Sequence, residues 1–326
     1  MCTGRFQTAL SEGRVLVADG AMGTTLFSLG LEGGGCPELL NVDRPGLVAD
    51  VHRRFAEAGC DIVLTNTFGG NGRRLALHGA SRRVDELNRA AVDVARAATA
   101  GHDTLIAGSV GPTGDLLAPL GPLSHDHAVE VFAEQMTALV EAEVDVIWIE
   151  TLSSLEELAA AAEAARGFDT PATATLSFDT AGRTMMGVTG AEVGAWAERS
   201  AGLAAVGANC GIGPGDAVAA VYDITATSPG TVAIAKPNCG MPLYQTDRLV
   251  YPVGPEDMGD FVELAVRSGA QIVGTCCGST PDHIAAVRKA VDARPHGGRP
   301  GREEIELRLE ARPIAAAPGQ RKRRRG

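Results

Sequence analysis

Three cysteines at the ends of two apolar segments are the residues of this chain best suited to chemistry. Cys276 and Cys277 stand side by side where the segment QIVGT stops, and Cys210 ends the earlier segment AAVGANC. Three thiolates suit a zinc ion whose fourth coordination position stays open for substrate. Neighbouring side chains of a regular strand point to opposite faces, so both members of the pair reach one ion only if the chain turns, and Gly278 permits that turn. The alternative is a buried pair that packs as small apolar side chains.

The composition indicates an ordinary globular enzyme. The chain has 326 residues, 45% of them hydrophobic and 21% charged. A net charge of −11 argues against a general nucleic-acid binder, and no segment has the roughly 18 uninterrupted apolar residues of a membrane span. The seven cysteines lack framework spacing and the N-terminus lacks a signal-peptide pattern. We therefore expect a cytoplasmic protein that binds neither nucleic acid nor membrane.

Short apolar runs alternate with longer helical stretches along most of the chain. Strands are predicted at 15–18, 61–66, 104–109, 144–150, 172–178, 204–210, 231–237 and 271–277. Helices are predicted near 45–58, 82–100, 125–142, 154–166, 191–202, 215–226, 256–268 and 281–293. Asp43, Ser124 and Thr280 are expected to cap three of these helices. Such alternation is typical of parallel βαβ units, and eight of them predict an α/β fold with one closed (β/α)8 barrel of the TIM type; an open doubly wound sheet is the alternative.

The expected barrel occupies residues 1–293, and the segment 294–326 differs in character. It is rich in Pro, Gly and Arg and ends in RKRRR. This composition predicts a short, disordered, basic C-terminal tail, in which EEIELRLE could form an isolated helical turn or two. The basic end could touch an acidic partner, the alternative being a solvated end without one.

The predicted strand ends carry polar or metal-binding residues, and the active site of a (β/α)8 barrel lies at the carboxyl ends of its strands. These positions are Asp19, Asn66, Ser109, Glu150, Phe178, Cys210, Pro237 with Asn238, and the pair Cys276 and Cys277. Polar groups therefore gather where the fold places chemistry, which strengthens the prediction of a zinc site.

Seven motifs in order resemble the homocysteine S-methyltransferase family over roughly residues 12–293. They are DGAMGTTL (19–26), TNTFGGN (65–71), GSVGPTGDLL (108–117), IETL (149–152), GANCGIGP (207–214), KPNCGMP (236–242) and GTCCGSTPDHI (274–284). The family includes the homocysteine-binding module of cobalamin-dependent methionine synthase and the betaine–homocysteine methyltransferases. The resemblance implies one zinc ion per chain, held by Cys210, Cys276 and Cys277. It also implies methyl transfer to the homocysteine thiol, whose thiolate is the nucleophile.

The resemblance also implies how the substrate is held. Carboxylates at Asp19 and Glu150 are expected to bind the ammonium group of homocysteine, although Asp19 could instead cap a loop and Glu150 could pair with a neighbouring basic residue. The substrate carboxylate is expected at the backbone amides of Gly20, Ala21, Met22 and Gly23. Asn209 is a further candidate that could hold a loop, touch substrate or do both. Cys239 could interfere as a fourth thiolate, or it could simply pack.

The methyl donor is the least determined feature. Betaine-using relatives cage the quaternary ammonium group in aromatic rings, with tyrosines at positions where this chain has Thr151 and Gly69. Only Phe68, Phe178, Tyr244 and Tyr251 could build a substitute cage. The S-methylmethionine-using branch is a weaker match, and we expect a barrel that stands alone without a cobalamin domain. We expect a methylcorrinoid protein as donor in trans, with methylcobalamin carried by that partner. The alternatives are betaine or another small onium donor and, in a different class, a non-catalytic homocysteine- or zinc-binding module.

Overall fold

A parallel eight-stranded sheet forms the centre of the molecule. The computed structural model describes residues 4–309 except 180, 201, 246 and 247. The strands of this sheet are β1 (Leu16–Val17), β2 (Ile62–Leu64), β3 (Leu105–Val110), β4 (Val146–Leu152), β5 (Ala172–Leu176), β6 (Leu203–Cys210), β7 (Ala233–Pro237) and β10 (Ala270–Val273). Their spatial order is β1-β10-β7-β6-β5-β4-β3-β2.

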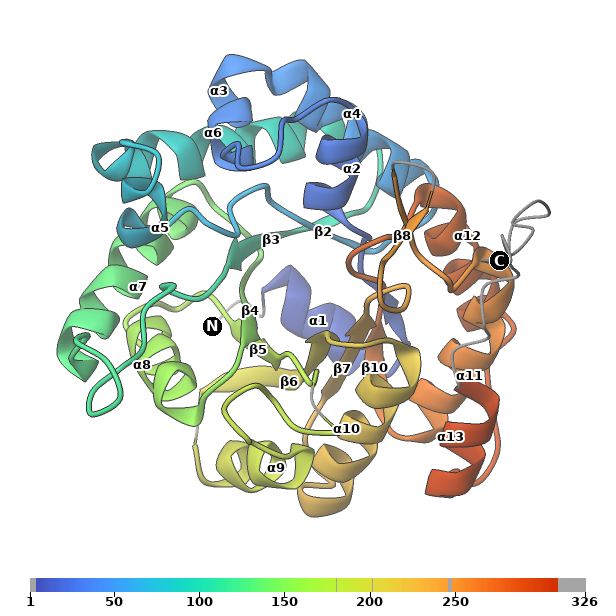
Figure 1. Ribbon diagram of the computed structural model, residues 1–326. Coiled ribbons are helices and arrows are strands. Elements are labelled where there is room, and N and C mark those ends of the chain that lie inside the picture. The colour runs from blue at the N-terminus through green and yellow to red at the C-terminus, as the bar shows by residue number, and fades with distance from the viewer. Residues whose placement is uncertain (1–3, 180, 201, 246–247, 310–326) are drawn as a thin grey trace, which may run out of the picture.

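The two edge strands of that order meet and close the sheet. A parallel bridge joins Ala18 to Ile62, and the amide of Asp19 donates to the carbonyl oxygen of Ile62 at 2.9 Å. The sheet is therefore a closed barrel surrounded by helices, as Figure 1 shows in a view along the barrel. The predicted (β/α)8 fold is confirmed.

Each barrel strand is followed by at least one helix. The helices are α1 (Arg5–Ser11), α2 (Met22–Ser28), α3 (Leu40–Asp43), α4 (Pro45–Glu57), α5 (Gly72–Ala76), α6 (Val84–Ala98), α7 (His125–Glu141), α8 (Leu155–Ala165), α9 (Gly190–Arg199), α10 (Pro214–Thr227), α11 (Met258–Arg267), α12 (Pro281–Asp292) and α13 (Arg302–Leu309). Short 3₁₀ turns lie at Pro37–Leu39, Ser81–Arg83 and Pro255–Asp257. None of these helices is long and apolar enough to cross a membrane.

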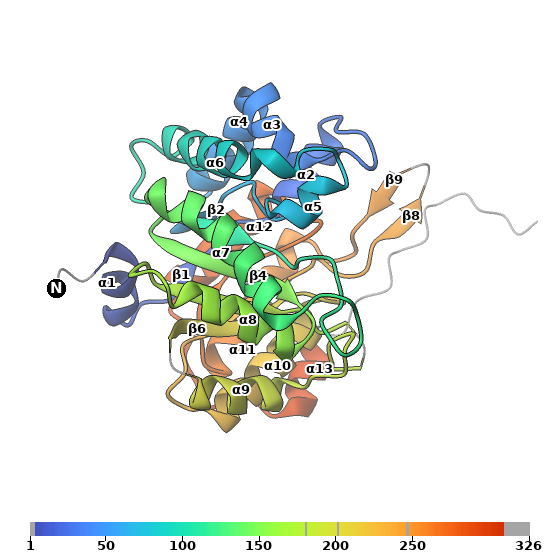
Figure 2. The same cartoon turned by 90° about the vertical axis from the view of Figure 1, so that its left-hand side faces the viewer.

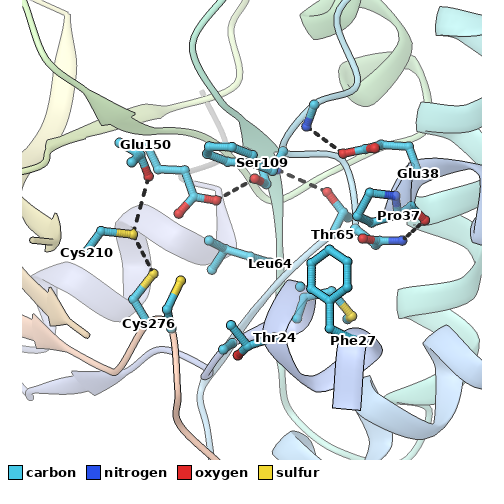
Figure 3. Close-up of a pocket in the computed structure, with 18 of the residues that line it drawn as sticks. Thr24, Phe27, Pro37, Glu38, Leu64, Thr65, Ser109, Glu150, Cys210 and Cys276 are labelled. Atoms are coloured by element: carbon cyan, nitrogen blue, oxygen red, sulfur yellow. Dashed lines mark hydrogen bonds between the residues drawn. The ribbon is translucent and has the colours of Figure 1, made fainter. Parts of the chain in front are cut away.

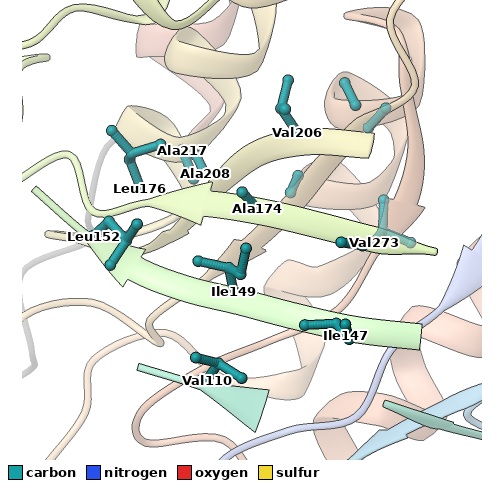
Figure 4. Close-up of a cluster of buried hydrophobic side chains, with 14 of the residues drawn as sticks. Val110, Ile147, Ile149, Leu152, Ala174, Leu176, Val206, Ala208, Ala217 and Val273 are labelled. Atoms are coloured by element: carbon teal, nitrogen blue, oxygen red, sulfur yellow. The ribbon is translucent and has the colours of Figure 1, made fainter. Parts of the chain in front are cut away.

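Alternate side chains of the barrel strands enter two separate apolar cores. Outward-facing residues such as Ile147, Ile149 and Val206 pack under the helices, as Figure 4 shows for part of this layer. Inward-facing residues such as Trp148 and Ile272 fill the barrel together with Phe6 of α1. The barrel interior is thus packed and its amino-terminal end is covered, which leaves the carboxyl end for a site.

Several short elements were not predicted from the sequence, among them the helices α1, α2, α3 and α5 and one hairpin. Helix α1 covers the amino-terminal end of the barrel, and an antiparallel hairpin of β8 (Leu243–Gln245) and β9 (Arg248–Val250) is inserted between β7 and α11. Figure 2 shows α1 and the hairpin at opposite ends of the molecule. The hairpin therefore stands on the same side as the carboxyl ends of the strands.

Part of the predicted tail is ordered. Residues 302–309 form α13, which packs against α10 and α11 and buries Ile305 completely. Arg308 donates to Asp260 at 2.6 Å and to Glu263 at 2.9 Å, so the packed helix is also held by ion pairs. The disorder expected from residue 294 is therefore wrong for 294–309. The basic end RKRRR lies outside the described residues.

Candidate metal and substrate site

The mouth of the barrel is lined by the last inward-facing side chains of the strands, at their carboxyl ends. Below them, the interior core is apolar, with Ala107, Trp148, Ile234 and Ile272 as members. Because side chains alternate along a strand, the inward positions two or four residues further on belong to the mouth. These are Ser109, Glu150, Lys236 and Cys276.

Cys210 does not follow this alternation. Its neighbour Asn209 has the inward position, yet the Cys210 backbone has φ 53°, in the left-handed region that non-glycine residues rarely adopt. Thr151, across from it, also has a positive φ, 64°. Asn209 joins the two, because its Oδ1 accepts from the Thr151 amide at 2.9 Å and its Nδ2 donates to Thr151 Oγ1 at 2.7 Å. Unusual backbone of this kind clusters at functional sites.

The segment after β10 turns at Gly278, as the sequence predicted. Gly278 has φ 85°, and a side chain there would collide with the ring of Tyr251. Asn238 connects this segment to the end of β6, since its Oδ1 accepts from the Cys277 amide at 2.9 Å and its Nδ2 donates to Gly211 O at 2.7 Å. The two cysteine-bearing segments are thus held in fixed relation.

The three predicted thiols come together. The Sγ atoms of Cys210, Cys276 and Cys277 all lie within 4.8 Å of one another, and those of Cys210 and Cys276 are 2.9 Å apart. Hydrogen bonds from Cys210 and Cys276 lower the pKa of Cys277, whereas the hydrogen bonds with Cys276 and Cys277 raise the pKa of Cys210. Three converging soft sulfur donors fit a zinc ion.

Cys239 lies beside this cluster but outside it. Its amide donates to the carbonyl oxygen of Cys277 at 2.9 Å, yet its thiol is not among the three sulfur atoms that converge in the described part of the chain. Burial raises the pKa of Cys239 to about 12. A buried thiol of this kind is inert, which agrees with a packing role.

A cavity of about 350 Å³ extends from the thiols across the barrel mouth. Figure 3 shows Cys210 and Cys276 at one side, Glu150 and Ser109 beside them, and Phe27, Pro37 and Glu38 at the other side. All but one of the predicted site residues line this cavity: Asp19, Gly20, Ala21, Met22, Gly23, Glu150, Cys210, Cys276 and Cys277. The exception is Asn209, which is buried behind the wall and bonded to Thr151.

Glu150 presents a carboxylate oxygen to this cavity. Its Oε1 accepts from Ser109 Oγ at 2.5 Å, and its other oxygen has no hydrogen-bond partner in the described part of the chain. Burial raises the pKa of Glu150 to about 7, with the Lys236 charge opposing that rise. An open carboxylate oxygen on a fixed side chain is suited to hold a substrate cation.

The Asp19 carboxylate contacts other groups of the protein. Its Oδ2 accepts from the Leu64 amide at 2.8 Å, and its Oδ1 lies 3.4 Å from the Lys236 ammonium. Lys236 also donates to the carbonyl oxygen of Thr275 at 2.8 Å. Lys236 belongs to the motif KPNCGMP but was not predicted as a site residue, and only its position in the inward-facing series could have identified it.

The amides of the loop after β1 are only partly available. The Ala21 amide donates to Ser279 Oγ at 3.0 Å, so it already has a partner. The first amides of α2, including those of Met22 and Gly23, have no acceptor within the helix, because no earlier helical turn supplies carbonyl oxygens. These two residues line the cavity, so their amides are the better candidates for an anionic group.

Aromatic side chains are sparse around the cavity. Of the four rings considered from the sequence, only Phe68 lines it, joined by Phe27, which the sequence analysis did not single out. Phe178 is buried elsewhere, Tyr251 packs against Gly278, and Tyr244 is 72% exposed on the hairpin. Of these rings only Tyr251 lies close to the thiols; burial, together with the charges of those thiols, raises the pKa of its hydroxyl to about 12, and it is not part of the cavity wall.

Known proteins match this chain along most of its length. The family profile described as Homocysteine S-methyltransferase matches residues 16–291. The methionine synthase of Mycobacterium leprae is 31% identical over 319 residues, covering 91% of this chain and 26% of that protein. That of Mycobacterium tuberculosis is 31% identical over 300 residues, covering 85% of this chain and 25% of that protein. The chain thus spans about a quarter of the length of these curated relatives.

A solved structure supports the same fold. The metallated form of the homocysteine methyltransferase MmuM from Escherichia coli superposes with a TM-score of 0.73 at 24% identity, covering 87% of this chain and 99% of that one. The family match extends over all eight barrel strands and includes the three converging cysteines. By this match the chain belongs to the homocysteine S-methyltransferase family, a family of methyltransferases.

Proposed function

We propose that this chain is a zinc-dependent homocysteine S-methyltransferase that makes methionine. The observation that carries the proposal is the convergence of three thiols beside a buried carboxylate with an open oxygen, in one cavity. A thiol-containing amino acid with an ammonium group matches both features. A cavity of about 350 Å³ is large enough for such a substrate.

Cys210, Cys276 and Cys277 would hold the zinc ion. Three sulfur ligands leave one tetrahedral position for a substrate atom. When bound, zinc supplies Lewis acidity that deprotonates a coordinated thiol at neutral pH. Asn209 and Asn238 keep the ligand-bearing segments in place through the hydrogen bonds described above.

The remaining residues position the substrate. Glu150 binds the ammonium group through its open oxygen, with Ser109 fixing the carboxylate. The amides of Met22 and Gly23 receive the substrate carboxylate, helped by the positive end of the α2 dipole. Asp19 and Lys236 form an ion pair that is part of the cavity wall. Their role is to keep the shape of this wall. Methyl transfer is an in-line displacement, so positioning supplies most of the rate.

A methylated corrinoid held by a partner protein is the donor that we favour. A small quaternary ammonium ion would not find an aromatic cage here, because Thr151 stands beside Glu150, Phe178 does not line the cavity and Tyr251 is a single ring beside the thiols. Exposed apolar side chains lie on segments that follow the strand ends, among them Phe27, Leu116, Leu120, Met185 and Tyr244. Exposed apolar groups of this kind suit a large partner.

Methionine formation with a set of donors tests this function. The purified, zinc-loaded protein is incubated with homocysteine and with methylcobalamin, betaine or S-methylmethionine, and methionine is quantified. We expect slow turnover with free methylcobalamin and little with betaine. Rapid methylation with betaine and none with methylcobalamin would identify betaine as the donor instead of a methylcorrinoid. Zinc and homocysteine binding without methionine from any donor would instead favour the non-catalytic module.

A further inference from the structure

Arg74 is a charged side chain without a partner on the wall of the catalytic cavity. Six residues with ionisable acidic or basic side chains other than cysteine line this cavity: Asp19, Glu38, Arg74, His78, Glu150 and Lys236. Asp19 and Lys236 pair with each other, Glu150 accepts from Ser109, and Glu38 accepts from the Gly69 amide at 2.6 Å. The Arg74 guanidinium has no hydrogen bond or ion pair with any residue of the described ranges.

The position of Arg74 is well defined. It lies on α5, and its amide donates to the side chain of Asn71, which caps that helix. Its side chain packs beside Gly114, where an added Cβ would lie 3.0 Å from Arg74 Cδ. The adjacent Arg73 differs, because its guanidinium pairs with Asp115 and it is not part of the cavity wall. Arg73 therefore has a partner and Arg74 has none; His78, further along the same segment, also lines the cavity and has no side-chain hydrogen bond or ion pair among the described residues, but it is not a permanent cation as a guanidinium is.

The barrel order separates Arg74 from the thiols. Arg74 follows β2, whereas Cys210 ends β6, and three strands separate β2 from β6 in each direction around the barrel. The charged groups of homocysteine already have partners near the thiols, namely Glu150 and the α2 amides. The Arg74 guanidinium, on the opposite wall of the cavity, is therefore available to an anionic group of the second substrate, the methyl donor.

We propose that Arg74 binds an anionic group of the methyl donor, either a carboxylate or a phosphate. This assignment rests on the proposed function and makes Arg74 a donor-specificity residue. A guanidinium suits both anions because its fork of N–H groups matches two oxygens at once. Phe27 and Phe68 line the same cavity and offer apolar contact to the body of the donor.

Two pairs of ligands, each with and without the anion, separate the sources of that group. Methylcobalamin carries a phosphodiester that methylcobinamide lacks together with its ribose and base, so only the part of that difference that depends on Arg74 counts; betaine carries a carboxylate that tetramethylammonium lacks. Binding of each compound to the zinc-loaded protein is measured by calorimetry or by corrinoid absorbance. The proteins are the wild type, Arg74→Gln, Arg74→Lys and the control Arg73→Gln.

We expect the anionic member of one pair to bind the wild type about tenfold or more tightly than its partner, the scale of a hydrogen bond to a charged group. Arg74→Gln should abolish this difference, Arg74→Lys should keep part of it, and Arg73→Gln should keep all of it. The affinity for homocysteine should be unchanged in Arg74→Gln.

Three results would overturn the assignment. They are a preference for the anion that persists in Arg74→Gln, a loss of homocysteine affinity in that variant, or no preference for either anion in the wild type. Failure of the proposed function is a separate result, the absence of methionine with the wild-type protein. The binding comparison is independent of turnover and decides the role of Arg74 in either case.

Discussion

Asp19 and Glu150 are buried carboxylates at the same barrel mouth, and their partners give them different roles. Burial raises the pKa of Asp19 to about 6 and that of Glu150 to about 7, and in both cases the nearby Lys236 charge opposes the rise. Asp19 lies 3.4 Å from that ammonium, whereas Glu150 keeps one oxygen open to the cavity. The ion pair favours a structural role for Asp19, whereas the open oxygen of Glu150 is available to a substrate.

Substitution of the two carboxylates separates these roles. Glu150→Gln should weaken homocysteine binding by about 1.5–3 kcal/mol, because it removes a charged acceptor, and zinc content should not change. Asp19→Asn should instead destabilise the fold by about 3–5 kcal/mol, because it leaves Lys236 buried without its counter-ion. Calorimetric titration with homocysteine and urea unfolding measure the two effects. Unaltered homocysteine affinity in Glu150→Gln would assign that residue a structural role.

Metal content tests the thiol cluster directly. Cys276→Ala removes one of three converging ligands, so zinc, expected at about one per chain in the wild type, and methyl transfer should both be lost while circular dichroism stays unchanged. Cys239→Ala is the matched control, since this buried neighbour lies outside the cluster and its replacement should keep the metal. Elemental analysis of both purified proteins gives the answer. Activity in a zinc-free Cys276→Ala protein would refute the site.

The ligand set could be predicted from the sequence, but its geometry could not. The strand-end positions of Cys210, Cys276 and Cys277 in a barrel, together with the family resemblance, were enough to predict that they come together. Strand alternation alone would have pointed Cys210 away from the mouth, and its positive φ is a tertiary effect stabilised by Asn209. Lys236 was missed because a single lysine in an apolar strand has no signature until the barrel places Asp19 beside it.

At the scale of elements, all eight predicted βα units are present, because hydrophobic periodicity determines them. The predicted caps Ser124 and Thr280 do precede α7 and α12, and the Ser124 side chain accepts from the His127 amide. The predicted cap Asp43 is wrong, since it belongs to α3 and Arg44 precedes α4 without a side-chain cap. Helix α1 was missed because seven residues without a capping side chain give little periodic signal.

Helix α4 contains a pH-sensitive position in His52. Both ring nitrogens are buried without a hydrogen-bond partner among the described residues, and burial lowers the pKa from 6.5 to about 4. As the pH falls below 6.5 the unfolded chain binds a proton at this position first. The stability present above that pH is therefore lost between about pH 6.5 and 4, by about 1.4 kcal/mol per pH unit.

The comparison of wild type with His52→Leu isolates this effect. Asp19 and Glu150 have raised pKa values, so their protonation in the folded state acts in the opposite direction and is common to both proteins. Urea unfolding at pH 7 and pH 5 should show a smaller loss on acidification in His52→Leu. An equal loss in the two proteins would mean that His52 is protonated in the folded state.

At the scale of the whole molecule, the packing of α13 against α10 and α11 predicts that this helix stabilises the barrel. A chain that stops at residue 293 should unfold at a lower temperature than one that stops at residue 309. The reason is the burial of Ile305, whose replacement by alanine should cost about 2–5 kcal/mol. Leu307→Ala is the control, because that side chain is 76% exposed. Equal melting temperatures of the two truncated chains would mean that α13 does not stabilise the barrel formed by residues 1–293.

The packed barrel interior also has an optical consequence. The chain has two tryptophans, and Trp148 is completely buried in the barrel, two residues before Glu150 on the same strand. Its indole N–H has no partner among the described residues, so its emission depends on the polar groups that approach from above. Trp196 lies on α9, partly buried on the outside of the barrel, and contributes a constant background. Intrinsic fluorescence can therefore follow the filling of the cavity without an attached dye, and Trp196→Phe leaves a protein with one emitter, in the barrel core two residues before Glu150.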